Sequence, residues 1–293
     1  MKTSTKAQLF AAAFCVLGAF AMPAQADADG LRAKHVELRE QLRNNNFQRA
    51  MHVDSSEANG MLQGDVYAVI DHPFSKVSRA LKQPAAWCDI MLLPFNTKLC
   101  QPTNGGAGLH VKIGRKYNQP VEQAYGLDFG FRNVAANANY LETRLDAPQG
   151  PVGTRDYRIV VSAVPVEGGK TFMHMRYSYG YGTMGKLAMN AYLSTAGADK
   201  VGFSLTGKDA NGKPQPIDGV RGAIERNAMR YYLAIDAYLD TMDLPPEQQV
   251  EKRIQAWFTA TERYPRQLRE MDRSTYAAMK RQEYERQTTA SLN

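Results

Sequence analysis

The segment DGVRGAIERNAMRYYLAIDAYLDTM (residues 218–242) decides how the rest of the chain is arranged, because it predicts one long helix. Asp218 suits the N-cap position, and Pro245-Pro246 ends the helical run. Residues recurring at three- and four-residue steps share one mainly apolar face, and most charged residues fall elsewhere. The residues of this face are Val220, Ile224, Asn227, Tyr231, Ile235, Tyr238 and Met242. At 1.5 Å per residue the helix is roughly 37 Å long, enough to cross a domain.

The region before this helix predicts an antiparallel sheet. A strand from Met61 to Asp71 is followed by two short helices, which begin near Asp71 and at Pro84, and by a strand from Phe95 to Gln101. Five further stretches place apolar residues at every second position, opposite a polar face. Their apolar residues are Leu109, Val111 and Ile113; Leu127, Phe129 and Phe131; Leu141, Thr143 and Leu145; Tyr157, Ile159, Val161 and Ala163; and Met173, Met175, Tyr177 and Tyr179. We therefore predict an α+β fold in which a curved sheet wraps around the 218–242 helix.

Further elements flank this core on both sides. We expect a surface helix from Leu31 to Arg43, a polar linker from Asp54 to Gly60, an inserted helix from Lys186 to Ala196 and a last strand from Lys200 to Leu205. Two helices come after the prolines, over 247–261 and 267–286, each with a thin apolar stripe. The predicted organisation is a leader (1–26), an N-terminal helix and linker (27–60), a ligand-binding domain (61–243) and a helical extension (244–293). We expect the ligand-binding domain to fold without the extension.

The first 26 residues predict a cleavable secretory signal. Lys2 and Lys6 precede an apolar run from Leu9 to Met22, which leads to Ala24-Gln25-Ala26. The run is too short to span a bilayer comfortably, and Phe14 before Cys15 does not fit a lipoprotein signal. We expect cleavage after Ala26 and a periplasmic or secreted protein.

The charge balance argues against nucleic-acid binding. Removing the two lysines of the leader lowers the formal net charge from +7 to +5, and basic and acidic residues are interspersed. A modest cationic surface remains compatible with a peripheral contact to an anionic membrane.

Cys88 and Cys100 remain after the leader is removed, and an oxidising compartment favours a disulfide between them. Closing a loop of about twelve residues contributes ~3 kcal/mol in the chain-entropy model. The alternative is a pair of free buried thiols.

The order of strand, two short helices, antiparallel strands and long helix resembles the START-like, helix-grip superfamily, also called SRPBCC. The resemblance rests on VIDHPFSKV (residues 69–77), on Leu81, Trp87 and Ile90, and on residues 220–239, and it covers roughly Met61 to Met242. It implies an apolar cavity between sheet and helix, since members bind lipids, sterols or other apolar ligands and some catalyse cyclisations or hydrolyses. The leader, the inserted helix and the two C-terminal helices depart from the pattern.

The predicted concave face is rich in wide, adaptable side chains. Methionine fills irregular space, and a buried tyrosine hydroxyl needs a partner. Each of these residues is also compatible with an ordinary packed core, and it is the family resemblance that favours a cavity. The candidate ligand-binding residues are Trp87, Phe129, Phe131, Met173, Met175, Tyr177, Tyr179, Asn227 and Tyr231. The Asn227 amide meets either a ligand head group or a partner within the protein, and we favour the latter because most buried amides are satisfied internally.

Motifs for other chemistries are missing from the sequence. No HExxH, GxSxG, P-loop or nucleotide-binding glycine motif is present, and no histidine lies at a metal-ligand spacing from another ligand residue. We predict no metal, no cofactor and no catalytic residue, although acid–base chemistry by an inward tyrosine or Glu225 stays open.

The sequence supports three functional hypotheses. The leading one is a periplasmic, non-catalytic carrier of a lipid or another apolar molecule. The first alternative is a cyclase- or hydrolase-like enzyme that uses the same cavity. The second is an envelope interaction protein that has no ligand and whose C-terminal helices bind a partner.

Overall fold

The computed structural model describes residues 23–290. The helices are α1 (Pro23–Glu37), α2 (Arg39–Arg43), α3 (Phe74–Leu81), α4 (Pro84–Leu92), α5 (Thr183–Leu193), α6 (Gly219–Thr241), α7 (Pro246–Glu262), α8 (Pro265–Leu268) and α9 (Arg273–Ala290). The strands are β1 (Met51–Ala58), β2 (Met61–Ile70), β3 (Thr97–Thr103), β4 (Gly108–Ile113), β5 (Tyr125–Ala136), β6 (Leu141–Gln149), β7 (Thr154–Val166), β8 (Lys170–Tyr181), β9 (Leu205–Lys208) and β10 (Pro214–Pro216). Most of the predicted leader lies outside the described residues. The predicted cleavage position after Ala26 falls in α1 and stays a prediction.

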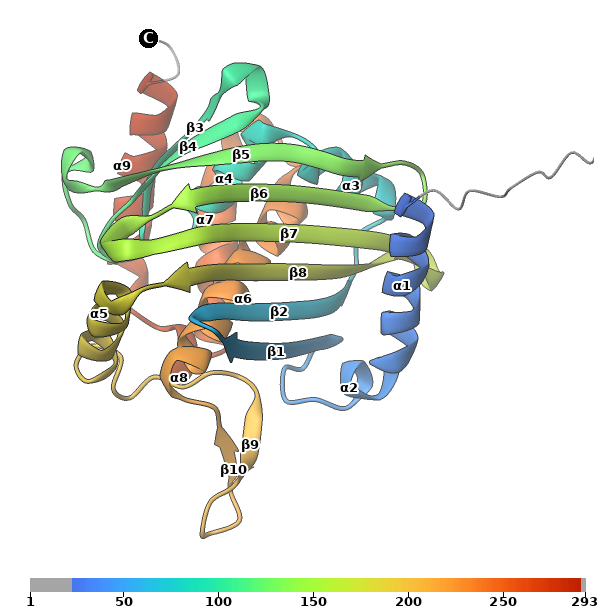
Figure 1. Ribbon diagram of the computed structural model, residues 1–293. Helices are drawn as coiled ribbons and strands as arrows, with labels where there is room; N and C mark the ends of the chain where they lie inside the picture. The colour runs from blue at the N-terminus through green and yellow to red at the C-terminus, as the bar shows by residue number, and fades with distance from the viewer. Residues whose placement is uncertain (1–22, 291–293) are drawn as a thin grey trace, which may run out of the picture.

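Eight strands form one curved antiparallel sheet in the order β1-β2-β8-β7-β6-β5-β4-β3 (Figure 1). Strands β3 to β8 form a meander, and β2 pairs with the last of them, placing Val66 opposite Met175. The β7–β8 turn needs its two glycines, because Gly168 and Gly169 both have positive φ angles. Helices α6 and α7 lie on one side of the sheet (Figure 1). This arrangement confirms the predicted helix-grip α+β fold.

The long helix α6 lies directly on β2. A β-carbon at Gly64 would come within 3.1 Å of the carbonyl oxygen of Ile224 and 3.2 Å of the Ala228 side chain, so a larger residue would force strand and helix apart by a few tenths of an ångström. Asp218 occupies the N-cap position, and its carbonyl accepts a hydrogen bond from Gly222 N–H at 2.9 Å. The predicted helix is confirmed to within one residue at each end.

The predicted polar linker at Asp54–Gly60 is wrong, because most of it belongs to strand β1. This strand pairs along its whole length with β2, from Met51 opposite Ala68 to Ala58 opposite Met61. It is an edge strand, and its last three residues are exposed. Exposed polar side chains on an edge strand resemble a loop in the sequence, although they protect the edge from pairing with other chains.

The predicted last strand at Lys200–Leu205 is also wrong. Strand β9 begins at Leu205 and pairs only with β10, in a hairpin that projects from the body (Figure 1). Residues 201–204 instead run along α6, where the N–H groups of Phe203 and Ser204 donate to the Glu225 carboxylate at 2.6 and 2.9 Å. The inserted helix is present as α5, which begins and ends three residues earlier than predicted.

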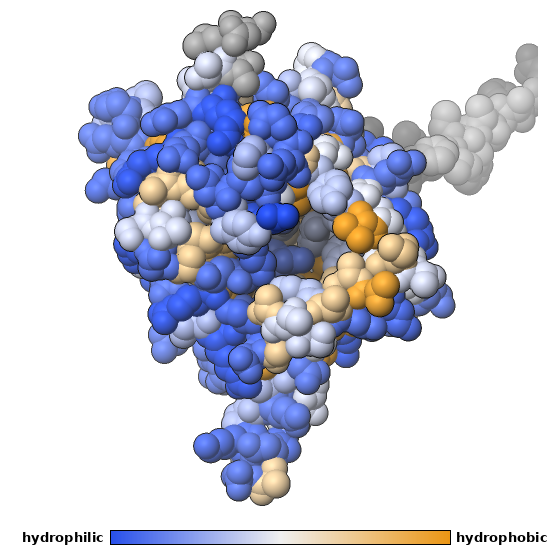
Figure 2. Space-filling model, turned by 90° about the vertical axis from the view of Figure 1, so that its left-hand side faces the viewer, coloured by the Kyte–Doolittle hydropathy of each residue, from blue (hydrophilic) through white to orange (hydrophobic). Residues whose placement is uncertain are grey.

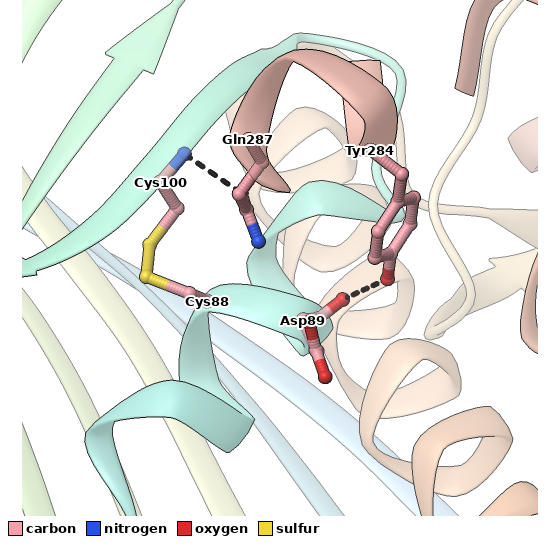
Figure 3. Close-up of a disulfide and its surroundings, with 5 residues drawn as sticks. All are labelled: Cys88, Asp89, Cys100, Tyr284 and Gln287. Atoms are coloured by element: carbon pink, nitrogen blue, oxygen red, sulfur yellow. Dashed lines mark hydrogen bonds between the residues drawn. A yellow bond between two sulfur atoms is a disulfide. The ribbon is translucent and has the colours of Figure 1, made fainter. Parts of the chain in front are cut away.

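Cys88 and Cys100 form the predicted disulfide, with their α-carbons 5.0 Å apart (Figure 3). The bond joins α4 to β3. Helix α9 covers the bond: Cys100 N–H donates to Gln287 at 3.1 Å, and the Tyr284 hydroxyl donates to the Asp89 carbonyl at 2.8 Å (Figure 3).

The C-terminal helices share the main core. Trp257 of α7 is fully buried, lies edge-on to Phe95 at 5.0 Å between ring centroids, and donates its indole N–H to the Arg230 carbonyl at 3.0 Å. On α9, buried Glu283 accepts hydrogen bonds from buried Lys98 and Lys280. The predicted domain end at residue 243 therefore separates side chains that pack in one core, and we now expect a chain truncated after Met242 to lose its cooperative unfolding.

The surface helix predicted over Leu31–Arg43 is two helices, α1 and α2, divided at Leu38, and both pack on the outer face of the sheet. Leu31, Leu38 and Leu42 form a second, smaller cluster with Tyr140 and Phe172. Within residues 23–290, none of the helices has both the length and the hydrophobicity needed to cross a bilayer.

We predict that Trp257→Ala lowers the free energy of unfolding by about 3–5 kcal/mol, because it opens a cavity in the main core. Denaturant unfolding followed by circular dichroism would measure this loss. Lys252→Ala, an exposed change on the same helix, is the control and should change stability little. Equal stabilities for the two variants would mean that α7 does not contribute to the core.

Candidate functional site

A cavity of 390 Å³ lies between the concave face of the sheet, α6 and α5. Its volume is in the range of small-molecule sites, roughly 300–1,000 Å³, near the lower end. Figure 2 looks onto this side of the molecule, where the surface is hollowed beside a group of apolar residues. The lining residues are Met91, Asn96, Ile113, Gly114, Arg115, Lys116, Leu127, Phe129, Pro151, Val152, Thr154, Tyr157, Tyr177, Tyr179, Gly185, Ala188, Met189, Tyr192, Ala223, Arg226, Asn227, Arg230 and Tyr231.

Five of the predicted ligand-binding residues line this cavity: Phe129, Tyr177, Tyr179, Asn227 and Tyr231. The rings of Tyr177 and Tyr231 meet across the space between sheet and α6, with centroids 5.3 Å apart. Asn227 accepts a hydrogen bond from Arg230 at 3.3 Å, so its carbonyl has a partner within the protein, as we favoured.

Trp87, Phe131, Met173 and Met175 are not among the lining residues, and all four are buried in the main core. The indole of Trp87 donates to the Leu81 carbonyl at 2.7 Å. The two methionines lie on the part of β8 that pairs with residues 66–68 of β2. Because α3 and α6 both pack on β8, these methionines fill a close-packed core.

A basic cluster at one end of the cavity was missed by the sequence analysis. Arg226 and Arg230 come from consecutive turns of α6, and Arg115 and Lys116 from the segment after β4. Among the described residues, no aspartate or glutamate lines the cavity. The four-residue spacing of the two arginines, on either side of Asn227, was the available signal.

The cluster is tied together around Glu270 and Tyr192. The Glu270 carboxylate accepts hydrogen bonds from Lys116 at 2.7 Å and from Arg230 at 2.5 Å. The Tyr192 hydroxyl, from α5, lies 3.2 Å from the Lys116 ammonium and 3.5 Å from Arg226. The cavity thus has a basic end and an otherwise largely aromatic and apolar wall.

The pKa values of the ionisable groups at the cavity are shifted by burial and by the positive charges of the basic cluster. Burial raises the pKa of the Tyr192 hydroxyl, but Lys116 and Arg226 outweigh it, so that the pKa lies below its usual value. Burial likewise raises the pKa of Glu270, and Arg230 with Lys116 holds it below its usual value. By contrast, burial raises the pKa of Tyr177 and Tyr231, which stay neutral.

The structure also brings His72 close to Asp236 and Asp240, a group that sequence spacing does not reveal. His72 lies 3.0 Å from Asp240. However, Asp236 already forms an ion pair with Arg49 at 2.7 Å, so the geometry is that of an ion-pair network between α6 and the loops beside it.

The chain is similar to several solved structures, all at low sequence identity. No family model and no curated protein matches this chain. Among solved structures, human StAR-related lipid transfer protein 5 is 8% identical, with a TM-score of 0.32, over 58% of this chain and 89% of that one. Norcoclaurine synthase from Thalictrum flavum is 13% identical, with a TM-score of 0.32, over 50% and 81%. A conserved protein of unknown function from Enterococcus faecalis is 9% identical, with a TM-score of 0.35, over 72% and 89%. At TM-scores this low, the matches carry no argument about function.

We predict that Glu270→Gln lowers the free energy of unfolding at neutral pH by about 3–5 kcal/mol, because it leaves buried Arg230 without its charged partner. The folded-state pKa of Glu270 is depressed, so its contribution is present above about pH 5 and is lost as pH falls through the folded pKa.

Unfolding midpoints of wild type and Glu270→Gln between pH 3 and 8 would test this. Glu262→Gln, which breaks the more exposed pair with Arg269, is the control and should cost less than about 1 kcal/mol. A wild-type advantage over Glu270→Gln that is unchanged at the lowest pH would contradict the assignment.

Proposed function

We propose that this chain binds a lipid or another apolar small molecule in its helix-grip cavity, without catalysing a reaction, and that it does so in the periplasm. The observation that carries the proposal is the cavity itself, with its predominantly aromatic and apolar wall between the sheet and α6. Such a wall favours apolar ligands, and a few polar groups set their orientation. The periplasmic location rests on the leader in the sequence and agrees with the Cys88–Cys100 disulfide.

The rim of the cavity supports a transient contact with a membrane. Met184 and Leu187 of α5 are 63% and 64% exposed, and Val152 in the neighbouring turn is 46% exposed. Lys186 lies between the first two in the sequence. Exposed apolar side chains beside a cation favour a lipid surface, and here Val152 lines the cavity while Met184 and Leu187 are sequence neighbours of the lining residues Gly185 and Ala188.

The envelope-interaction alternative is less well supported. It needs C-terminal helices with a free apolar face, whereas Trp257, Phe258 and Tyr276 of α7 and α9 are buried in the main core.

The binding proposal is tested by native mass spectrometry of protein purified from its own host, with lipid extraction, which would identify a ligand that co-purifies.

One observation favours the enzyme alternative. Tyr192 has a lowered pKa, lies beside Lys116 and faces the cavity, so its hydroxyl is a candidate acid or base. If the chain is a carrier, Tyr192→Phe should still take up and release ligand, with an affinity changed by no more than about tenfold because one hydroxyl of the cavity wall is lost. If a ligand extracted from the host is converted by wild type, and the conversion falls by about 10²-fold or more in Tyr192→Phe, the enzyme hypothesis replaces the carrier.

Two methionine substitutions separate cavity from core. Met189→Trp adds bulk to the cavity wall and should change stability little while it blocks uptake of a fluorescent fatty acid. Met175→Trp, the matched control, adds the same bulk to the close-packed core and should cost about 1–3 kcal/mol by overpacking. Unfolding midpoints and uptake would be measured on the same delipidated samples. Normal uptake by folded Met189→Trp would place the ligand elsewhere.

A further inference from the structure

The basic end of the cavity holds more positive charge than its acidic neighbours balance. Lys116, Arg226 and Arg230 line the cavity. Burial lowers the pKa of nearby Lys200, and the charges of Arg230 and Lys116 lower it further. Within residues 23–290, Glu270 is the carboxylate paired with this group, and it serves Lys116 and Arg230 together.

Arg226 lacks a carboxylate partner among the described residues. Its side chain is buried, at 1% exposure, and makes only two long hydrogen bonds, to the Val201 carbonyl at 3.3 Å and the Tyr192 hydroxyl at 3.5 Å. Its Nε is buried without a partner in the described part of the chain, as is the Nε of Arg230. A buried, unpaired guanidinium is unfavourable, so its presence at a cavity wall points to an anion.

The neighbouring acid does not supply that anion. Glu225 precedes Arg226 on α6, but its carboxylate accepts hydrogen bonds from the Ser55 hydroxyl and from the N–H groups of Phe203 and Ser204. Between the described atoms it forms no ion pair with Arg226. Tyr192, the other polar group near Arg226, is a hydroxyl whose lowered pKa reflects the same positive surroundings.

Much of the remaining wall is apolar or aromatic. Leu127 and Phe129 of β5, Met189 of α5, and Tyr177 and Tyr231 lie along it. A ligand that satisfies both parts has a compact apolar body and one anionic group. The guanidinium fork of arginine suits both carboxylate and phosphate oxygens.

We propose that the cavity selects amphipathic anions, with a carboxylate or phosphate group bound by Arg226, Arg230 and Lys116 and an apolar body packed against the aromatic wall. This proposal rests on the proposed function and narrows its ligand class. Arg226 is the central contact, because Arg230 and Lys116 already share Glu270.

Four probes with the same ten-carbon chain test the head-group preference: decanoate, decyl phosphate, decanol and decylamine. Titration calorimetry on delipidated protein should give affinities for the two anions at least about tenfold above that for decanol, and the weakest binding for decylamine. A separate titration with inorganic phosphate distinguishes a site that binds any anion from one that also requires the apolar chain.

Arg226→Met removes the charge and keeps much of the side-chain length. It should reduce the preference for decanoate over decanol by about tenfold and leave decanol affinity unchanged. Arg226→Lys, the matched control, should keep most of the preference. Without ligand, Arg226→Met should melt no lower than wild type and up to about 2–4 °C higher, because it removes a buried unpaired charge. Melting several degrees lower would mean that Arg226 stabilises the fold by donating to Val201, and it would overturn the assignment of Arg226 as the anion-binding residue.

Lys116→Met, at a partly exposed position on the cavity wall, is a second variant that should fold and lose several-fold in decanoate affinity. If wild type binds decanol as tightly as decanoate, the anion proposal fails and the proposed function stands. If only inorganic phosphate binds, the amphipathic ligand class is wrong. If none of the probes binds, this proposal fails, and so does the proposed function for ligands with a single apolar chain.

Discussion

Close packing of α6 against the sheet is the interaction on which the rest of the structure depends. Gly64 lets the backbone of β2 approach Ile224 and Ala228 at van der Waals distance, which fixes the helix over β2 and β8. At Met173 and Met175, which pair with residues 66–68 of β2, the core is filled. Farther along the sheet, towards β4, β5 and the ends of β7 and β8, the cavity remains, and Tyr177 and Tyr231 contact each other at its wall.

The same packing explains the unusual burial of charge on α6. Residues 201–204 and helices α7 and α8 pack against α6, and Glu225, Arg226 and Arg230 of this helix are buried. Burial of charge is unfavourable unless partners are supplied, and the partners come from distant parts of the chain. Glu225 is satisfied by Ser55 and by two backbone N–H groups, and Arg230 by Glu270, whereas Arg226 is left facing the cavity.

The C-terminal region is therefore part of the site as well as of the core. Glu270 lies in the segment between α8 and α9, and it sets how much unbalanced positive charge lines the cavity. Helix α9 holds this region in place, through buried Glu283 between Lys98 and Lys280 and through the contacts around the disulfide. Helix α5 and its exposed apolar residues complete the wall on the side that opens to solvent.

Local patterns in the sequence were enough to predict the helix-grip fold, because strand alternation, helical periodicity and the prolines after Met242 can each be read from neighbouring residues. The sequence also identified five lining residues, since inward-facing positions on a strand or helix are set by its period. It did not separate Tyr177 from Met175, because the strand period fixes only the face that a residue takes, and the packing of other elements decides whether that position meets a cavity. The edge strand β1 was predicted wrongly, because its polar residues resemble a loop. Tertiary structure alone decided that Trp257 belongs to the core and that Arg226 lies unpaired at the cavity wall. Both depend on contacts between residues far apart in the chain, which no local pattern records.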